Sequence, residues 1–330
     1  MVLGLVVVVI VGLAVLRLSG SEPDTGPAPA PMPARVSSPA RQAWPDDLPA
    51  GTLFAAAAGR VYTIDTSSGA LARTSAEADP ARTSMTRLGD EMLVWRQGSR
   101  TRQVLEAGSR SAAPVRGELR SATSFLPGPG GRVWTTRGSR SGSSTWRLVD
   151  VDGRVTTSVE VDGAAVSDGA GGLLGSGRQE FRPTFPGPRR ARQAGQVIAT
   201  GPDGYLVRSC VETECRFTVH RHGDDTGTVI DTAVGEVTSG GTLSPSNRFL
   251  AVTETVGGTS TVRVSVVATG QVLDIFAEPQ ESTSDAVWLN DRWLALTSDD
   301  HLVLYDAPDD RVVTPAVPLS SVGPLAWRPA

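Results

Sequence analysis

The sequence contains no lysine, only two cysteines and three histidines, and aromatic residues make up 5% of its 330 positions. Three histidines are too few for a rich acid–base or metal site. The chain has neither the Gly-x-Ser-x-Gly elbow of serine hydrolases nor a glycine-rich phosphate loop between a strand and a helix. All 31 strongly basic residues are arginine, which is typical of a GC-rich bacterial genome; selection of arginine for recognition is the alternative. No named chemistry follows from these residues.

Turn residues recur along the chain in two series, each with a period of roughly 40 residues. Short apolar runs of strand length separate them, four to a period. Self-similarity of this kind is typical of a β-propeller, a ring of four-stranded sheets, so the predicted fold class is all-β. The first series is Leu126-Pro127, Ser167-Asp168, Gly201-Pro202-Asp203-Gly204, Ser244-Pro245-Ser246-Asn247, Leu289-Asn290-Asp291 and Arg328-Pro329, and the second is Gly69, Gly108, Gly153, Gly187, Gly223, Gly270 and Asp309-Asp310.

Six complete four-strand units can be assigned, and the two ends of the folded part complement each other. Residues 53–74 read as three strands that lack a first strand, and residues 324–329 read as a first strand that lacks the other three. Two ends that share one blade close a ring by strand pairing and leave no open edge. We therefore predict seven four-stranded blades, with six or eight as alternatives, closed where the C-terminal strand joins the N-terminal blade. The six complete units cover residues 83–117, 120–161, 164–194, 196–231, 241–276 and 286–317.

Three turns carry a resemblance to known repeats. Ser244-Pro245-Ser246-Asn247, Gly201-Pro202-Asp203-Gly204 and Asp65-Thr66-Ser67-Ser68-Gly69 match the "SPDG" and "D-x-x-x-G" punctuation of propeller repeats. Residues 51–330 resemble the bacterial WD40-like and TolB-like β-propellers, notably membrane-tethered versions from high-GC bacteria. The Trp-Asp and Gly-His dipeptides of eukaryotic WD40 repeats do not recur, which leaves the subfamily open.

The N-terminus differs from the rest of the chain. Residues 2–16 are apolar or glycine without interruption, and a helix of about 17 residues covers roughly 25 Å, slightly less than a hydrocarbon core of about 30 Å. We predict an uncleaved transmembrane signal anchor at residues 1–18; a signal peptide cleaved near Ser19 or Ser21 is the alternative. Residues 19–50 contain eight prolines and are predicted to form an extended Pro/Ala-rich linker, and residues 51–330 the propeller.

Cys210 and Cys215, the only cysteines, lie on either side of a four-residue turn between two apolar runs. The spacing predicts a β-hairpin with the two sulfurs opposite each other, and hence a disulfide worth ~2 kcal/mol. A metal site with His220 and His222 is the alternative, and it lacks further ligands. Because disulfides persist outside the cytosol, the folded domain is predicted to be extracytoplasmic, on a single-pass protein of the cell membrane.

Charge is unevenly distributed in this chain of net charge −4. Residues 82–147 contain twelve arginines and four carboxylates, whereas residues 221–330 contain six arginines and fifteen carboxylates. On a ring these segments would form a basic and an acidic side, able to bind an anionic envelope component or a partner protein; ordinary solvated surface is the alternative. Nucleic acid is not expected as a partner of an exported domain. The densest basic cluster, a predicted patch for an anionic partner in the least regular unit, comprises Arg178, Arg182, Arg189, Arg190 and Arg192.

Several other residues could suggest a metal site or a ligand site, but a structural role is the simpler interpretation. Asp150-Val151-Asp152-Gly153 resembles the start of a calcium loop but lacks the later ligands, so it is predicted to be a hairpin turn. His301 is predicted to lie in a turn. Trp95, Trp134 and Trp293 occupy matching second-strand positions, which favours a core between blades over a ligand platform.

The predicted function is a non-catalytic, membrane-tethered scaffold that binds a protein or an envelope polymer, without cofactor or metal. The alternative is a propeller hydrolase acting on a carbohydrate or lactone with carboxylates in the central channel. A third, weaker hypothesis is an accessory sensor domain. Three or more carboxylates converging in a central pocket would favour the hydrolase.

Overall fold

The computed structural model describes residues 42–330 except 107, 139–142, 176–178, 182–188, 191–194, 212–213, 223–226, 231–235, 257–258, 278–285 and 299–300. These residues form 28 β-strands and two short 3-10 helices, η1 (Gly117–Arg120) and η2 (Pro129–Gly131), which confirms the all-β class. No helix in this part of the chain is long and apolar enough to cross a membrane. The predicted anchor at residues 1–18 lies outside the described residues, as does most of the linker.

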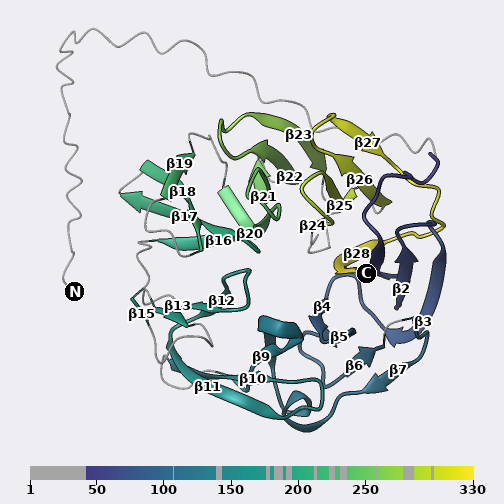
Figure 1. Ribbon diagram of the computed structural model, residues 1–330, viewed down its shortest axis with the longest axis vertical. Coiled ribbons are helices and arrows are strands. Elements are labelled where there is room, and N and C mark those ends of the chain that lie inside the picture. The colour runs from purple at the N-terminus through teal and green to yellow at the C-terminus, as the bar shows by residue number, and fades with distance from the viewer. Residues whose placement is uncertain are drawn as a thin grey trace, which may run out of the picture. The chain divides into compact units, whose positions relative to one another are not determined.

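The strands form antiparallel meanders of four, in which each strand pairs with the next in sequence. Figure 1 shows that the sheets follow one another around a circle in chain order, the arrangement of a β-propeller. Three four-stranded sheets correspond to the predicted units at 83–117, 120–161 and 164–194. Their strands are β4 (Thr83–Leu88), β5 (Glu91–Arg96), β6 (Arg102–Leu105) and β7 (Ala112–Pro114); β8 (Ser124–Pro127), β9 (Val133–Thr136), β10 (Ser143–Val149) and β11 (Val155–Asp162); and β12 (Ala165–Ser167), β13 (Leu173–Gly175), β14 (Gln179–Phe181) and β15 (Arg189–Arg190).

The next two predicted units are fused into one eight-stranded sheet. Their first strands pair in parallel, with Ala199 opposite Gly241 and Thr200 opposite Thr242. Gly241 has no side chain at this pairing, which suits a close approach of two backbones. The strands are β16 (Gln196–Gly201), β17 (Gly204–Val211), β18 (Glu214–Arg221), β19 (Gly227–Ile230), β20 (Glu236–Leu243), β21 (Phe249–Val256), β22 (Thr259–Val266) and β23 (Val272–Ala277).

The last strand of the chain closes the circle. It pairs antiparallel with the first strand of the folded part, with Leu53 opposite Trp327 and Ala55 opposite Leu325, which is the pairing that the sequence predicted. Hydrophobic side chains of both ends enter one core cluster with Trp293. The remaining strands are β28 (Val322–Pro329), β1 (Gly51–Ala57), β2 (Arg60–Asp65) and β3 (Leu71–Glu77) in one sheet, and β24 (Val287–Trp288), β25 (Trp293–Ser298), β26 (His301–Asp306) and β27 (Arg311–Val313) in the other.

The predicted tryptophan core between sheets is confirmed. Trp134 and Trp293 are fully buried. Trp134 packs against Leu173 of the next sheet. Trp95 is half-buried, and its ring centroid lies 4.9 Å from that of Phe125 on β8. These aromatic side chains fill the space between neighbouring sheets, which is their usual role in stacked β-structure.

The ring has two different ends. In each meander the first turn (between strands one and two) and the third turn lie at one end, here called the first-turn end, and the second turn lies at the other, the second-turn end. First turns of neighbouring sheets contact one another. Trp134 Nε1 donates to Gly171 O at 2.9 Å, and Ser246 N donates to Asp291 Oδ1 at 2.7 Å. The turns that the sequence singled out therefore also hold adjacent sheets together.

Residues 42–50, here called the strap, pack against the ring although the sequence assigned them to the linker. Gln42 N donates to Thr314 O at 2.9 Å and Ala316 N donates to Gln42 O at 3.2 Å, just after β27. Leu48 is buried in the core cluster that contains both chain ends. The predicted linker of residues 19–50 is thus too long at its C-terminal end, because apolar residues of the strap have buried positions on the ring.

The strap crosses from one sheet to the next. Trp44 Nε1 donates to Thr66 O at 2.6 Å, in the turn after β2, and Asp47 Oδ2 lies 3.4 Å from Arg292 NH1, in the turn before β25. These contacts tie the sheet of β24–β27 to the sheet that contains β28 and β1. The strap therefore reinforces the ring where the two chain ends meet.

Candidate functional site

The arginine patch predicted from the sequence is not settled by the structure. Arg178, Arg182 and Arg192 lie outside the described residues. Arg189 and Arg190 form β15, where Arg189 pairs with Glu180 and Arg190 with Gln179 of β14. Their side chains are likewise outside the description. The patch for an anionic partner therefore stays a prediction.

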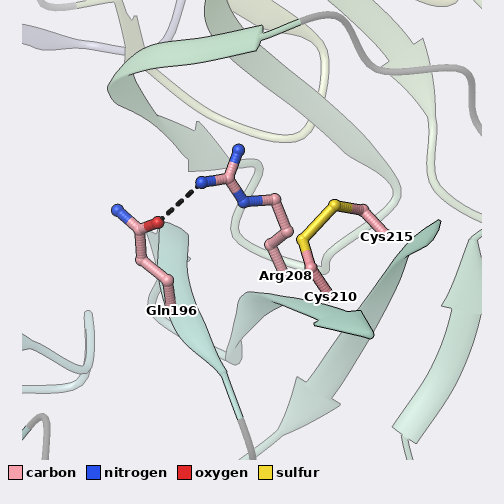
Figure 2. Close-up of a disulfide and its surroundings, with 4 residues drawn as sticks. All are labelled: Gln196, Arg208, Cys210 and Cys215. Atoms are coloured by element: carbon pink, nitrogen blue, oxygen red, sulfur yellow. Dashed lines mark hydrogen bonds between the residues drawn. A yellow bond between two sulfur atoms is a disulfide. The ribbon is translucent and has the colours of Figure 1, made fainter. Parts of the chain in front are cut away.

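The predicted disulfide is confirmed. Cys210 and Cys215 face each other at the end of the β17–β18 hairpin, and both residues are exposed. Figure 2 shows Arg208 on the same strand, with its guanidinium donating to Gln196 Oε1 at 2.9 Å. With both sulfurs in the bond, this pair has no thiolate to offer a metal or a substrate.

The histidines do not form a reactive centre. The rings of His220 and His222 lie 5.4 and 5.7 Å from the ring of Tyr205. Burial lowers the pKa of His220, which keeps its imidazole neutral at neutral pH. His301, predicted to lie in a turn, is instead the first residue of β26 and pairs with Ser298. The described residues contain no cluster of three metal-ligating side chains.

Two buried carboxylates lie in ion pairs with arginines. The buried Asp306 accepts hydrogen bonds from Arg292 and Arg311, and Glu254 pairs with Arg263 at 2.8 Å, with both side chains buried. These two carboxylates are therefore held by arginine side chains. The sequence 150–153 forms the predicted hairpin turn, in which Gly153 N donates to Asp150 O at 3.0 Å.

The clearest binding feature is a groove at the first-turn end, here called the arginine groove. It has a volume of about 730 Å³ and runs from β18 and β19 across the turns of β20–β23 to the turn before β27. Its lining comprises Val219, Arg221, Thr228, Ser246, Asn247, Arg248, Phe249, Val266, Val267, Ala268, Leu273, Ala307 and Pro308. The volume is that of a site for a small ligand or a few residues of a peptide.

The turn at residues 244–247 positions one side of the groove. Asn247 N donates to Ser244 O at 2.8 Å, and Ser244 Oγ accepts the N–H of Phe249 at 3.1 Å. Asn247 has φ of 58°, a left-handed conformation that asparagine tolerates better than most residues. The turn buries Phe249 as part of the floor and leaves Arg248 exposed at the rim.

The groove is cationic and partly apolar. Arg221 and Arg248 are both exposed and have no ion-pair partner among the described residues. Arg248 lies over the ring of Phe249, 5.3 Å from its centroid, while Val219 supplies further buried apolar surface. Guanidinium groups above an apolar floor suit a ligand that combines carboxylates or phosphates with apolar groups.

Among the residues that the structure describes, the lining contains no carboxylate, histidine or cysteine that could act as an acid, a base or a nucleophile partner. The Ser246 hydroxyl donates to Asp291 Oδ1 at 2.7 Å. The sequence did not single out Arg221 or Arg248; the only available signal was that Arg248 directly follows a recognised turn.

Comparisons with known proteins bear on the fold. No family model matches the sequence, and neither does any curated protein. Similar solved structures include a functionally unknown protein from Desulfotomaculum acetoxidans (TM-score 0.53, 13% identity, 85% of this chain and 100% of that one) and an acylaminoacyl peptidase (TM-score 0.51, 13% identity, 77% and 49%). TolB from Acinetobacter baumannii is also similar (TM-score 0.46, 13% identity, 85% and 67%). At such identities the likeness concerns the fold alone. The strand topology itself identifies this chain as an all-β protein with a β-propeller fold.

Proposed function

We propose that this protein is a TolB-like propeller of seven blades that acts as a non-catalytic binding scaffold, held outside the cytosol by a membrane anchor at its N-terminus. The count of seven treats the eight-stranded sheet as two blades joined at their first strands. The observation that carries the proposal is the arginine groove, where the exposed guanidinium groups of Arg221 and Arg248, which make no ion pair with any described residue, border an apolar floor. The alternative hydrolase has no comparable support among the described residues.

The partner is a protein or an anionic polymer of the cell envelope, bound through the arginine groove. A segment with acidic and apolar groups in alternation would place carboxylates at Arg221 and Arg248 and apolar groups over Phe249. Rim charges chiefly accelerate and orient association, so binding is expected to weaken with salt.

Site-specific photocrosslinking in intact cells tests this proposal. A photoreactive residue at Ala268 of the full chain, in the groove, is expected to capture one defined partner. The same residue at Val151, which is 44% exposed in a third turn of another sheet, is the control. The double variant R221Q/R248Q is expected to reduce the Ala268 adduct about tenfold or more, since each charge-assisted contact contributes about 1 kcal/mol. Equal adducts at both positions, or an adduct that the double variant leaves unchanged, would contradict a partner at the groove.

The redox state of the two cysteines tests independently whether the domain lies outside the cytosol. If the domain is exported, a membrane-permeant maleimide is expected to label neither Cys210 nor Cys215 in intact cells until a reductant is added. The variant C215S, which leaves one cysteine unpaired, is the positive control for labelling. Quantitative labelling of the wild-type protein without reductant would place the domain in the cytosol, where glutathione keeps thiols reduced.

A further inference from the structure

A second charged feature lies at the opposite end of the ring from the groove. Five arginines gather around the second turn of the β4–β7 sheet, at residues 97–101, and are here called the arginine cluster. They are Arg82, Arg96, Arg100, Arg102 and Arg120. All belong to the arginine-rich segment of the sequence.

Hydrogen bonds and chain positions place the five residues together. The backbone of Arg82 lies beside the turn, since Gln97 N donates to Arg82 O at 2.8 Å. Arg102 NH1 donates to the carbonyl oxygens of Arg100 and Arg120, each at 3.2 Å. Arg96 ends β5 immediately before the turn. The cluster is therefore contiguous and spans the end of one sheet and the entry to the next.

The positive charge of this cluster is not neutralised by the protein. None of the five arginines has an ion-pair partner among the described residues, and all but Arg102 are exposed. Burial and the charge of Arg100 lower the pKa of Arg102, as repulsion between neighbouring cations requires.

Three carboxylates near the arginine cluster form no ion pair with its arginines. Glu118 pairs with Arg137 at 2.6 Å and lies 3.5 Å from Arg147. Asp79 Oδ1 accepts the N–H of Ala81 within its own turn. The exposed Glu77, at the end of β3, makes no ion pair among the described residues.

Trp44 and Asp47 of the strap contact turns at the first-turn end, whereas Gln42, its first described residue, lies beside the segment after β27. β27 starts at the third turn of its sheet, at the first-turn end, so the residues after it lead toward the second-turn end. Gln42 bonds to Thr314 and Ala316 in that segment. The predicted anchor ends at residue 18, and the 23 residues from there to Gln42 span at most roughly 70 Å when extended. A tether of this length allows the arginine cluster to reach a membrane that holds the anchor.

From this arrangement we propose that the arginine cluster docks the ring onto anionic phospholipid headgroups of the membrane that carries the anchor. Guanidinium groups bind phosphate oxygens in pairs of hydrogen bonds, and each arginine near an anionic surface strengthens binding about fivefold. Tethering makes the contact intramolecular, so weak electrostatic attraction is enough to populate it. Docked in this way, the ring presents the arginine groove away from the bilayer, where a partner can reach it. The inference rests on the proposed membrane anchor.

Quenching by headgroup-labelled lipid tests the orientation. The full chain carries one added cysteine, Gln97→Cys in the cluster or Ala268→Cys in the groove, labelled with a fluorophore while the native disulfide stays oxidised. Each protein is placed in vesicles of phosphatidylcholine alone or with 30% phosphatidylglycerol, both containing a nitroxide-headgroup lipid. We expect strong quenching at position 97 only in the anionic vesicles, little at position 268, and loss of the difference in 0.5 M salt.

Matched charge variants complete the test. R82Q/R96Q/R100Q is expected to weaken docking about 100-fold and abolish quenching at position 97. R73Q/R110Q/R154Q, which removes three exposed arginines at other places, is expected to leave it unchanged. Equal quenching at both positions, or in neutral vesicles, would overturn the proposal. So would protection of position 97 by inorganic polyphosphate with no response to anionic vesicles, which would indicate a polymer site. A chain that does not float with any vesicle would instead refute the anchor, and hence the proposed function.

Discussion

Replacing Asp306 with alanine is expected to lower the free energy of unfolding by about 2–3 kcal/mol, because a buried carboxylate loses three charge-assisted hydrogen bonds while its two arginine partners, 40% and 49% exposed, can be hydrated. The carboxylate is fully buried. It accepts Arg292 Nε and NH2 at 2.7 and 2.6 Å and Arg311 NH2 at 3.0 Å. The substitution leaves both guanidinium groups without this acceptor beside Trp293. Urea unfolding followed by tryptophan fluorescence measures the loss.

Asp309 provides the matched control, because it contacts the same arginine from an exposed position. Its Oδ2 lies 2.6 Å from Arg292 NH2, and its side chain is 60% exposed. The variant D309A is expected to cost less than about 1 kcal/mol, as exposed ion pairs do. Similar losses in D306A and D309A would show that burial does not set the strength of this network.

The same carboxylate predicts how stability depends on pH. Burial raises the pKa of Asp306, but the hydrogen bonds and charges of Arg292 and Arg311 together outweigh it, and the pKa lies below that of an ordinary aspartate. The unfolded chain therefore takes up the proton first as the pH falls. The stabilisation is complete above the unfolded pKa of about 4 and is lost as the pH falls through the native pKa. The difference in stability between wild type and D306A should shrink in acid; a constant difference would contradict this assignment.

Replacing Gly171 with alanine is expected to cost about 3–5 kcal/mol, from backbone strain together with a clash that cannot relax. Gly171 has φ of 92°, which L-residues rarely adopt. An added Cβ would lie 2.5 Å from the nitrogen of Pro129 in the first turn of the neighbouring sheet. The carbonyl of Gly171 also accepts the indole N–H of Trp134, so a shift of this turn would break a buried hydrogen bond.

Gly98 is a control that distinguishes the cost of backbone strain from the cost of the steric clash. It has φ of 71°, but an added Cβ would meet no atom within 4 Å. G98A is therefore expected to cost only about 1 kcal/mol, the price of the left-handed backbone alone. Urea midpoints of the two variants measured side by side give the steric contribution as the difference. Equal midpoints would show that contact between first turns does not constrain the ring.

Much of the fold could be predicted from the sequence because its signals are local. Turn residues at a regular period set the strands of each sheet, and an unmatched first strand at 324–329 predicted the pairing with β1. The spacing of Cys210 and Cys215 was sufficient for the hairpin and its disulfide. The strap escaped prediction because proline-rich composition suggests an extended linker. Trp44 and Asp47 contact two sheets whose residues are far apart in the sequence, so these contacts could not be predicted from sequence alone.

The candidate sites likewise combine features that the sequence predicts with features that only the folded structure shows. The sequence alone determined that the chain is all-β, that its repeats form a ring, and that one segment is rich in arginine, because strand period, turn chemistry and composition are properties of neighbouring residues. Only the tertiary structure decided which arginines are neutralised. Arg292 meets Asp306 and the strap, whereas Arg248 and Arg100 make no ion pair with any carboxylate that the structure describes. The physical reason is that the charge a side chain presents depends on partners brought from distant parts of the chain, and these are fixed only when the ring closes.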